Sequence, residues 1–115
     1  MRDMNNILSL LDNYTFDNAD DIARMLADDF RKRRIEKNMT REQVAEKSGV
    51  AVSNIVRFEQ KGLISLKNLI ALAMAMGYTS EVKNIFNQPK YSTMEELTQI
   101  RKNTGKSRAF KKEIW

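Results

Sequence analysis

The chain has 115 residues, a length that suits one compact domain with short extensions. It carries 20 lysines and arginines against 15 aspartates and glutamates, and it contains neither cysteine nor histidine. Without thiolates and imidazoles, disulfides, cysteine or histidine metal sites, cysteine nucleophiles and histidine general bases are excluded. We therefore expect no catalytic residue, no metal and no cofactor.

The charge is distributed unevenly along the chain. Residues 1–29 hold seven aspartates and two arginines, whereas residues 30–115 hold 18 basic and eight acidic residues. A basic body of this kind is typical of proteins that bind polyanions such as nucleic acid. The longest apolar run, at 69–76, is far shorter than the roughly 20 residues of a membrane span, and the N-terminus lacks a targeting pattern. We expect a cytoplasmic, nucleoid-associated protein that has no contact with a membrane.

Apolar residues recur every three or four positions, and the chain has one proline and four glycines, so we predict an all-α fold. Residues 1–18 form an acidic N-terminal extension, in which 5–13 is either a short amphipathic helix or loose chain. The next helix begins after Asn18, a good capping residue, and runs to about residue 37. Its predicted inward stripe consists of Ile22, Met25, Leu26, Phe30 and Arg34.

Three shorter helices are predicted in the middle of the chain. Thr40 and Gln43 have the spacing of a capping box at the start of the second helix, and Gly49 ends that helix. A third helix spans Val52–Gln60. A fourth, strongly apolar helix begins after Ser65, whose hydroxyl is a suitable cap.

The C-terminal part is predicted to be less regular. Residues 79–86 read as a short helix, and Pro89 prevents its continuation. A further helix covers 92–102, with Ser92 and Glu95 as its capping box. Beyond it the sequence is basic and aperiodic, which predicts a tail that is mobile unless bound. The predicted organisation is an extension at 1–18, a central domain at 19–87, and a C-terminal helix with a basic tail at 88–115.

The spacing of residues 44–62 predicts two helices that cross steeply. Ala45 is small enough to let the third helix approach the second, Gly49 supplies the turn, and Ile55 fills the space between them. This arrangement is a helix-turn-helix, whose second helix fits the major groove of duplex DNA. If Ile55 and Phe58 point inward, the candidate base-contacting residues of the third helix are Val52, Ser53, Asn54, Val56 and Arg57.

Residues 23–77 resemble the Cro/C1-type (Xre) helix-turn-helix repressors, through "FRKRRIEKNMTREQVAEKSGVAVSNIVRFEQKG" and "SLKNLIALAMAMG". The resemblance implies a compact, lambda-repressor-like bundle of about five helices, flanked by an N-terminal extension and by a C-terminal helix with a basic tail. It also implies a structural ion pair between Arg34, late in the first helix, and Glu59, at the end of the recognition helix.

The chain departs from the pattern of this family at four positions. Arg41 stands where the family usually has glutamine, and Ala51 replaces the usual serine or threonine cap of the recognition helix. Val52 and Val56 stand where polar residues are common, and the two valines also suit a protein interface. The candidate contacts to backbone phosphates are Arg41, Gln43, Lys47, Lys61 and Lys67.

These features predict a sequence-specific regulator of transcription that binds double-stranded DNA. We expect a dimeric repressor that reads a palindromic operator, because one small recognition helix buries too little surface to bind both tightly and selectively. Among the base contacts we expect most from Arg57 and Ser53, since arginine can make two hydrogen bonds to guanine. For Lys47 and Lys67, the alternative is a plain solvated side chain.

The segment "NQPKYSTMEELTQIRKNTGKSRAF" resembles the tail of Xre-type regulators that accompany kinase-like toxins of the HipA type. That resemblance implies an alternative function as an antitoxin, which binds such a toxin and autoregulates its operon. A toxin or another protein would then bind through the termini, where Phe110, Ile114 and Trp115 are unexpectedly apolar. A protein-binding module without selective DNA affinity is the other class that the sequence leaves open.

Overall fold

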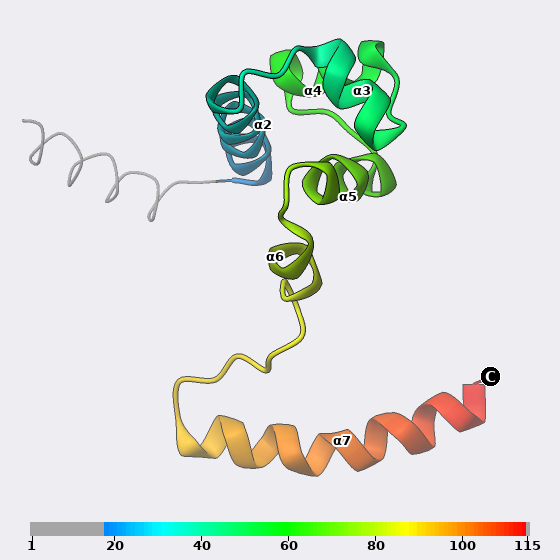
Figure 1. The fold of residues 1–115 in the computed structure, drawn as a ribbon. Coiled ribbons are helices and arrows are strands. Elements are labelled where there is room, and N and C mark those ends of the chain that lie inside the picture. The colour runs from blue at the N-terminus through cyan, green and yellow to red at the C-terminus, as the bar shows by residue number, and fades with distance from the viewer. Residues whose placement is uncertain (1–17, 115) are drawn as a thin grey trace, which may run out of the picture. The chain divides into compact units, whose positions relative to one another are not determined.

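The structure, a computed structural model, describes residues 18–114, and it describes the surroundings of side chains as far as residue 106. Six helices and no strand occur in this part of the chain (Figure 1), so the all-α prediction is confirmed. The helix considered at 5–13 and the predicted extension, apart from residue 18, lie outside the described residues. The helices are α2 (Ala19–Glu36), α3 (Arg41–Ser48), α4 (Val52–Lys61), α5 (Leu66–Ala75), α6 (Thr79–Lys83) and α7 (Met94–Ile114).

The described helices fall into two compact units, with the division after Thr79. The first unit contains α2 to α5, and the second unit begins at Ser80 and contains α7. In the first unit α4 contacts both α2 and α3, and α5 contacts α3. No helix between residues 18 and 114 has both the length and the apolar character needed to cross a membrane. The domain boundary between residues 87 and 88 that the sequence predicts stays a prediction.

The helices of the first unit begin where short polar side chains cap them. The Asn18 side chain accepts a hydrogen bond from the backbone amide of Asp21, and the Ser65 hydroxyl accepts one from the amide of Asn68. Thr40 and Gln43 form a reciprocal capping box: the Gln43 amide donates to the Thr40 hydroxyl at 3.1 Å, and the Thr40 amide donates to Gln43 Oε1 at 2.8 Å. These three predicted caps are confirmed. Each satisfies a backbone donor that the start of a helix otherwise leaves unpaired.

The hydrophobic core lies among α2, α3, α4 and α5. Phe58 and Ile55 of α4 are almost completely buried, and the Phe58 ring centroid lies 5.6 Å from that of Phe30 on α2. Burying side chains of this size contributes about 1.5–3 kcal/mol each. The buried cluster consists of Ala27, Val44, Val50, Ile55, Phe58, Leu72 and Met76.

The predicted inward stripe of α2 is wrong over its first half. Ile22, Met25 and Leu26 are between 43% and 49% exposed, whereas Ala27 is 1% exposed. The end of α4 lies close to this part of α2, since a Cβ on Gly62 would lie 3.2 Å from the backbone carbonyl carbon of Ala23. Alanines, Ala23 and Ala27, stand on α2 at this end. Large apolar residues therefore do not mark the contact.

The C-terminal part differs from the prediction in three respects. Helix α6 ends at Lys83 instead of residue 86. The predicted capping box of Ser92 and Glu95 is wrong: the Thr93 hydroxyl accepts from the amide of Glu96, and the Glu96 carboxylate accepts from the amide and the hydroxyl of Ser92. Helix α7 also continues to Ile114, where a mobile tail was predicted after residue 102. Between residues 102 and 114 there is no proline and a single glycine, and lysine, arginine and alanine favour helix. The helix therefore continues because its residues favour helix, although apolar residues do not recur there at helical spacing.

Candidate nucleic-acid interface

The turn between α3 and α4 depends on one glycine. Gly49 has a φ of +76°, a conformation that side chains strongly disfavour, and its amide donates to the carbonyl of Ala45 at 2.8 Å. The next residue, Val50, is buried, and its amide donates to the Ser48 hydroxyl. The chain thus turns from α3 into α4 within three residues, and α4 begins at Val52.

Helix α4 has a buried face and an open face. Ile55 and Phe58 are at most 2% exposed, so they fix the helix on the core. The residues predicted to contact bases lie elsewhere on the helix: Ser53, Asn54 and Arg57 are exposed, and Val52 and Val56 are half-buried. Ala51 precedes α4 without a side-chain capping hydrogen bond, because alanine has no polar side-chain atom. The open side of α4 therefore carries hydrogen-bonding groups that the core does not use.

A group of three charged residues holds α4 to α2 and α3. The Arg34 guanidinium makes two bonds to the Glu59 carboxylate, Nε to Oε2 at 2.7 Å and Nη2 to Oε1 at 3.0 Å. A third bond, from Arg34 Nη1 to the carbonyl of Met39, ties in the loop before α3. Arg41 Nε also donates to Glu59 Oε1, at 3.1 Å. The Glu59 side chain is 1% exposed, so both arginines compensate a buried negative charge.

The surroundings of Glu59 change its proton affinity. Burial raises the pKa of this carboxyl, but hydrogen bonds from Arg34 and Arg41, together with their positive charges, outweigh burial. The resulting pKa lies below the ordinary value of 4.5. Glu59 is therefore ionised near neutral pH, and the three-residue group carries a net positive charge.

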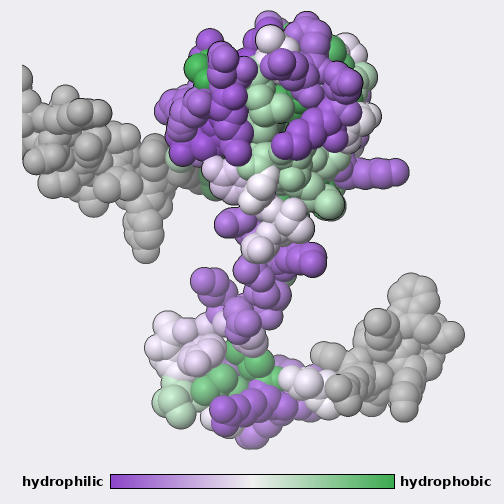
Figure 2. Space-filling model, in the orientation of Figure 1, coloured by the Kyte–Doolittle hydropathy of each residue, from purple (hydrophilic) through white to green (hydrophobic). Residues whose placement is uncertain are grey.

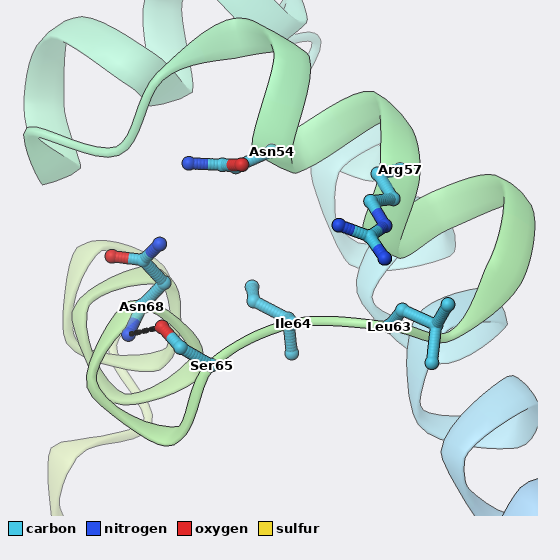
Figure 3. A pocket seen from close by; sticks show the side chains of 6 residues that line it. All are labelled: Asn54, Arg57, Leu63, Ile64, Ser65 and Asn68. Atoms are coloured by element: carbon cyan, nitrogen blue, oxygen red, sulfur yellow. Dashed lines mark hydrogen bonds between the residues drawn. The ribbon is translucent and has the colours of Figure 1, made fainter.

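An open cleft of about 390 Å³ lies between α4 and the start of α5. Asn54 and Arg57 project towards it from α4, and Ser65 and Asn68 line it from the α5 side (Figure 3). Ile64 and Leu63, in the connecting loop, complete the lining. Neither Asn68 nor Ile64 stood out in the sequence, because their place beside Arg57 depends on how the loop folds back.

The predicted phosphate contacts have different surroundings. Lys47, Lys61 and Lys67 are exposed and lie near the ends of α3, α4 and α5. The Gln43 side chain is used in the capping box, where it accepts from the amide of Thr40. Arg41 is bound to Glu59, with its side chain 34% exposed. A phosphate contact by any of these residues stays a prediction.

Two helices joined by a tight glycine turn, the second with a polar open face, define a helix-turn-helix protein. The comparison with protein families agrees with this class: the family model described as helix-turn-helix matches residues 30–83. The matched segment covers α3, α4 and α5 completely. No curated protein matches the chain. The family match supports DNA binding in transcription regulation in general, and the family is not one of enzymes.

Proposed function

We propose that the protein is a sequence-specific transcriptional repressor, which inserts α4 into the major groove of duplex DNA. The open face of α4 is the observation that carries this proposal. Ser53, Asn54 and Arg57 are exposed on a helix that Ile55 and Phe58 hold rigidly from behind. Because these polar groups are positioned before binding, contact with base edges requires little further ordering of the helix.

The charges around α4 support the same proposal. Exposed lysines lie near the ends of α3, α4 and α5: Lys47, Lys61 and Lys67. Such lysines suit phosphates on either side of a groove, where they would set the position of the protein without reading sequence. Arg57 offers the two parallel donors that select guanine, worth about 1–3 kcal/mol against other bases.

We further propose that the repressor acts as a dimer on a palindrome, and that the DNA-binding domain spans residues 19–87. One recognition helix covers only a few base pairs, which gives too little discrimination among the many sites of a genome. A second copy related by a twofold axis doubles the length of the site that is read. The two half-sites would lie about one helical turn of DNA apart.

The experiment that tests the proposal is selection of binding sites from random duplex DNA at about physiological salt, because low salt favours unselective phosphate attraction. The Arg57→Ala protein is selected in parallel, with Lys67→Ala as a matched control that removes a positive charge near the same cleft. We expect the wild type to enrich a palindrome and Arg57→Ala to lose preference at one symmetric position.

The control separates base reading from charge. Lys67→Ala should enrich the same palindrome with weaker affinity, since a phosphate contact carries no sequence information. If the wild-type protein enriches no sequence at all, the proposed repressor function is wrong. If Arg57→Ala enriches the unchanged palindrome, α4 does not read DNA through Arg57.

One observation favours a second candidate function, that of an antitoxin. In the second unit, four large apolar residues within ten positions are at least half exposed: Ile85, Phe86, Tyr91 and Met94. Phe86 is 94% exposed. A phenylalanine so exposed gains free energy when a partner buries its ring. We propose that this segment binds a kinase-like toxin when the protein acts as an antitoxin.

This second function is tested by purification of the full chain from its native host, followed by identification of proteins that stay bound. A kinase-like protein should be recovered with the wild type and lost with Phe86→Ser, while both proteins bind the selected DNA equally. Lys90→Ser, in the same segment, is the matched control. Recovery of no kinase-like protein, or equal recovery with Phe86→Ser, contradicts the antitoxin function.

A further inference from the structure

The charges of α7 are divided between its two halves. Residues 94–100 contain two glutamates and no lysine or arginine. Residues 101–112, which we call the basic half of α7, contain no aspartate or glutamate and six basic residues: Arg101, Lys102, Lys106, Arg108, Lys111 and Lys112. The first three of these six residues are exposed. The repressor and antitoxin functions leave them without a role.

The basic half has no compensating charges in its own helix. No aspartate or glutamate stands three or four positions from any of the six basic residues, and these are the spacings at which helix side chains form ion pairs. Lys102 and Lys106 stand four positions apart, so like charges are neighbours and lower the stability of the helix. The helix macrodipole favours basic residues only within the last turn, and residues 101–106 lie about two turns or more before that end. Negative charge supplied from outside the helix would remove the repulsion.

Large apolar side chains stand before the basic half. Met94, Leu97 and Ile100 belong to the first half of α7, whereas residues 101–108 include no large apolar residue. Figure 2 shows apolar, green atoms where Figure 1 places the start of α7, and the atoms that follow along the coloured part of the helix are purple or pale. A helix that lies on a membrane or in the groove of a partner protein needs an apolar face along its length. The basic half lacks one, so it suits a polyanion that is bound through its charges.

We propose that the basic half of α7 is a second DNA-binding element, which contacts phosphates of the duplex next to the site that α4 reads. The inference rests on the proposed function, since that function supplies duplex DNA as the polyanion. A duplex carries one negative charge per about 1.7 Å of its axis. The basic half extends over about 17 Å at 1.5 Å per residue, so phosphates are available along its whole length. Because phosphates are the same in every sequence, the element adds affinity without adding sequence preference.

The connection between α6 and α7 is long enough for both parts to bind one duplex. Residues 84–93 join the two helices, and none of them is helical. Ten residues span at most about 33–36 Å when fully extended, which is about one helical turn of DNA. Once α4 is bound, the connection holds the basic half near the flanking duplex at an effective concentration of about millimolar. Phosphate contacts that are weak by themselves then slow the dissociation of the whole protein.

Fluorescence anisotropy with a random-sequence duplex of about three helical turns, measured over a range of salt concentrations, tests the proposal on the full chain. No selected site is needed, because phosphate contacts form on any duplex. A triple variant carries Arg101→Gln, Lys102→Gln and Lys106→Gln, all at exposed positions. We expect it to bind at least about tenfold more weakly at physiological salt. The slope of log affinity against log salt should fall by about 2–3, since each lost contact removes about 0.9.

Two control variants separate contact from net charge. Arg24→Gln, Arg31→Gln and Lys32→Gln together remove the same number of charges from exposed positions of α2, and the slope should stay within about 0.9 of the wild-type value. Arg101→Lys with Lys106→Arg keeps every charge of the basic half. This second control should bind as the wild type does, because a phosphate is bound through positive charge and carries no sequence information.

The possible results separate the second DNA-binding element from the repressor function. Equal slopes for the wild type and the α7 triple variant overturn the element, and so does an equal loss in the α2 control. The element is also wrong if the α7 variant keeps the wild-type slope on DNA and instead loses binding to vesicles that contain phosphatidylserine. If the slopes are as expected and the wild type enriches no sequence, only the repressor function fails. When both hold, the α7 variant should enrich the same palindrome as the wild type, with lower affinity.

Discussion

The ten residues of α4 form two faces with different roles. The inner face is apolar and ends in a buried carboxylate, so Ile55, Phe58 and Glu59 each have partners within the fold. The outer face presents Ser53 and Arg57, whose polar groups are open to solvent. Substitutions on the inner face should therefore change stability, whereas substitutions on the outer face should change binding.

The largest expected effect is that of Glu59→Ala on the inner face. The substitution leaves two arginines without the buried carboxylate that compensates them, and removing one partner of a buried ion pair costs about 3–5 kcal/mol. Chemical denaturation followed by circular dichroism measures the loss. Glu36→Ala is the control, because Glu36 pairs with Arg33 at the exposed surface, where such pairs contribute at most about 1 kcal/mol. Equal losses for the two substitutions would contradict the role assigned to Glu59.

The next largest effect is expected at Gly62, where α4 ends against α2. Its φ is +69°, and a Cβ there would lie 3.1 Å from the backbone nitrogen of Arg24. Gly62→Ala should destabilise the fold by about 2–4 kcal/mol, since left-handed strain of about 1–2 kcal/mol is joined by a contact with backbone that cannot move aside.

Gly49→Ala is the matched control for this steric cost. Gly49 has a similar φ of +76°, but a Cβ there would meet no atom within 4 Å. The control should therefore show the backbone strain alone. The difference between the two free energies of unfolding measures how closely α4 approaches α2, and no difference would mean that α2 moves away at little cost.

Much of the bundle could be predicted because its signals are local. The Thr40 and Gln43 capping box, the Gly49 turn and the burial of Ile55 and Phe58 each depend on residues a few positions apart. Such patterns carry their own physical cause, either an unpaired amide or the helical period. The limits of α3, α4 and α5 followed from these patterns to within about two residues.

The features that escaped prediction depend on distant parts of the chain. Ile22 and Met25 are larger apolar residues than Ala27, but Ala27 lies in the core cluster while the other two are exposed, and this depends on how α2 is placed against α4. The bond from Arg41 to Glu59 joins positions 18 residues apart, and a long side chain has several partners within reach. The cleft beside Arg57 likewise forms only when the loop after α4 folds back.

A pH titration extends the comparison to charge on the inner face. The pKa of Glu59 lies below its ordinary value of 4.5, so the unfolded chain takes up a proton at a higher pH than the folded one. The stability that Glu59 contributes is therefore present above pH 4.5, and it is lost as the pH falls through the lower pKa of the folded state. Glu59→Gln should remove this part of the pH dependence, measured as the free energy of unfolding between neutral and acidic pH.

On the outer face, Ser53→Ala should lower the affinity for DNA slightly and leave stability nearly unchanged. Stability should stay within about 0.5 kcal/mol of the wild type, since Ser53 is exposed. Affinity for the selected DNA should fall by about 1 kcal/mol, or roughly fivefold, the typical contribution of one hydrogen bond. Fluorescence anisotropy and thermal unfolding on the same protein separate the two quantities. A loss of stability without a loss of affinity would mean that Ser53 belongs to the inner face of α4.

Arg41 tests the boundary between the two faces, because it is bound to Glu59 and yet 34% exposed. Its bonds to Glu59 use Nε and Nη2, and a guanidinium has further donors that a phosphate could accept from. Arg41→Gln should lower stability by less than about 1 kcal/mol, since Glu59 keeps both bonds from Arg34.

The same substitution should change how DNA affinity responds to salt. Loss of one phosphate contact reduces the slope of log affinity against log salt by about 0.9. Lys47→Gln, at the other end of α3, should reduce the slope equally and leave stability unchanged. If Arg41→Gln lowers stability and leaves the slope as it is in the wild type, Arg41 belongs to the inner face alone, and α3 contacts DNA through other residues.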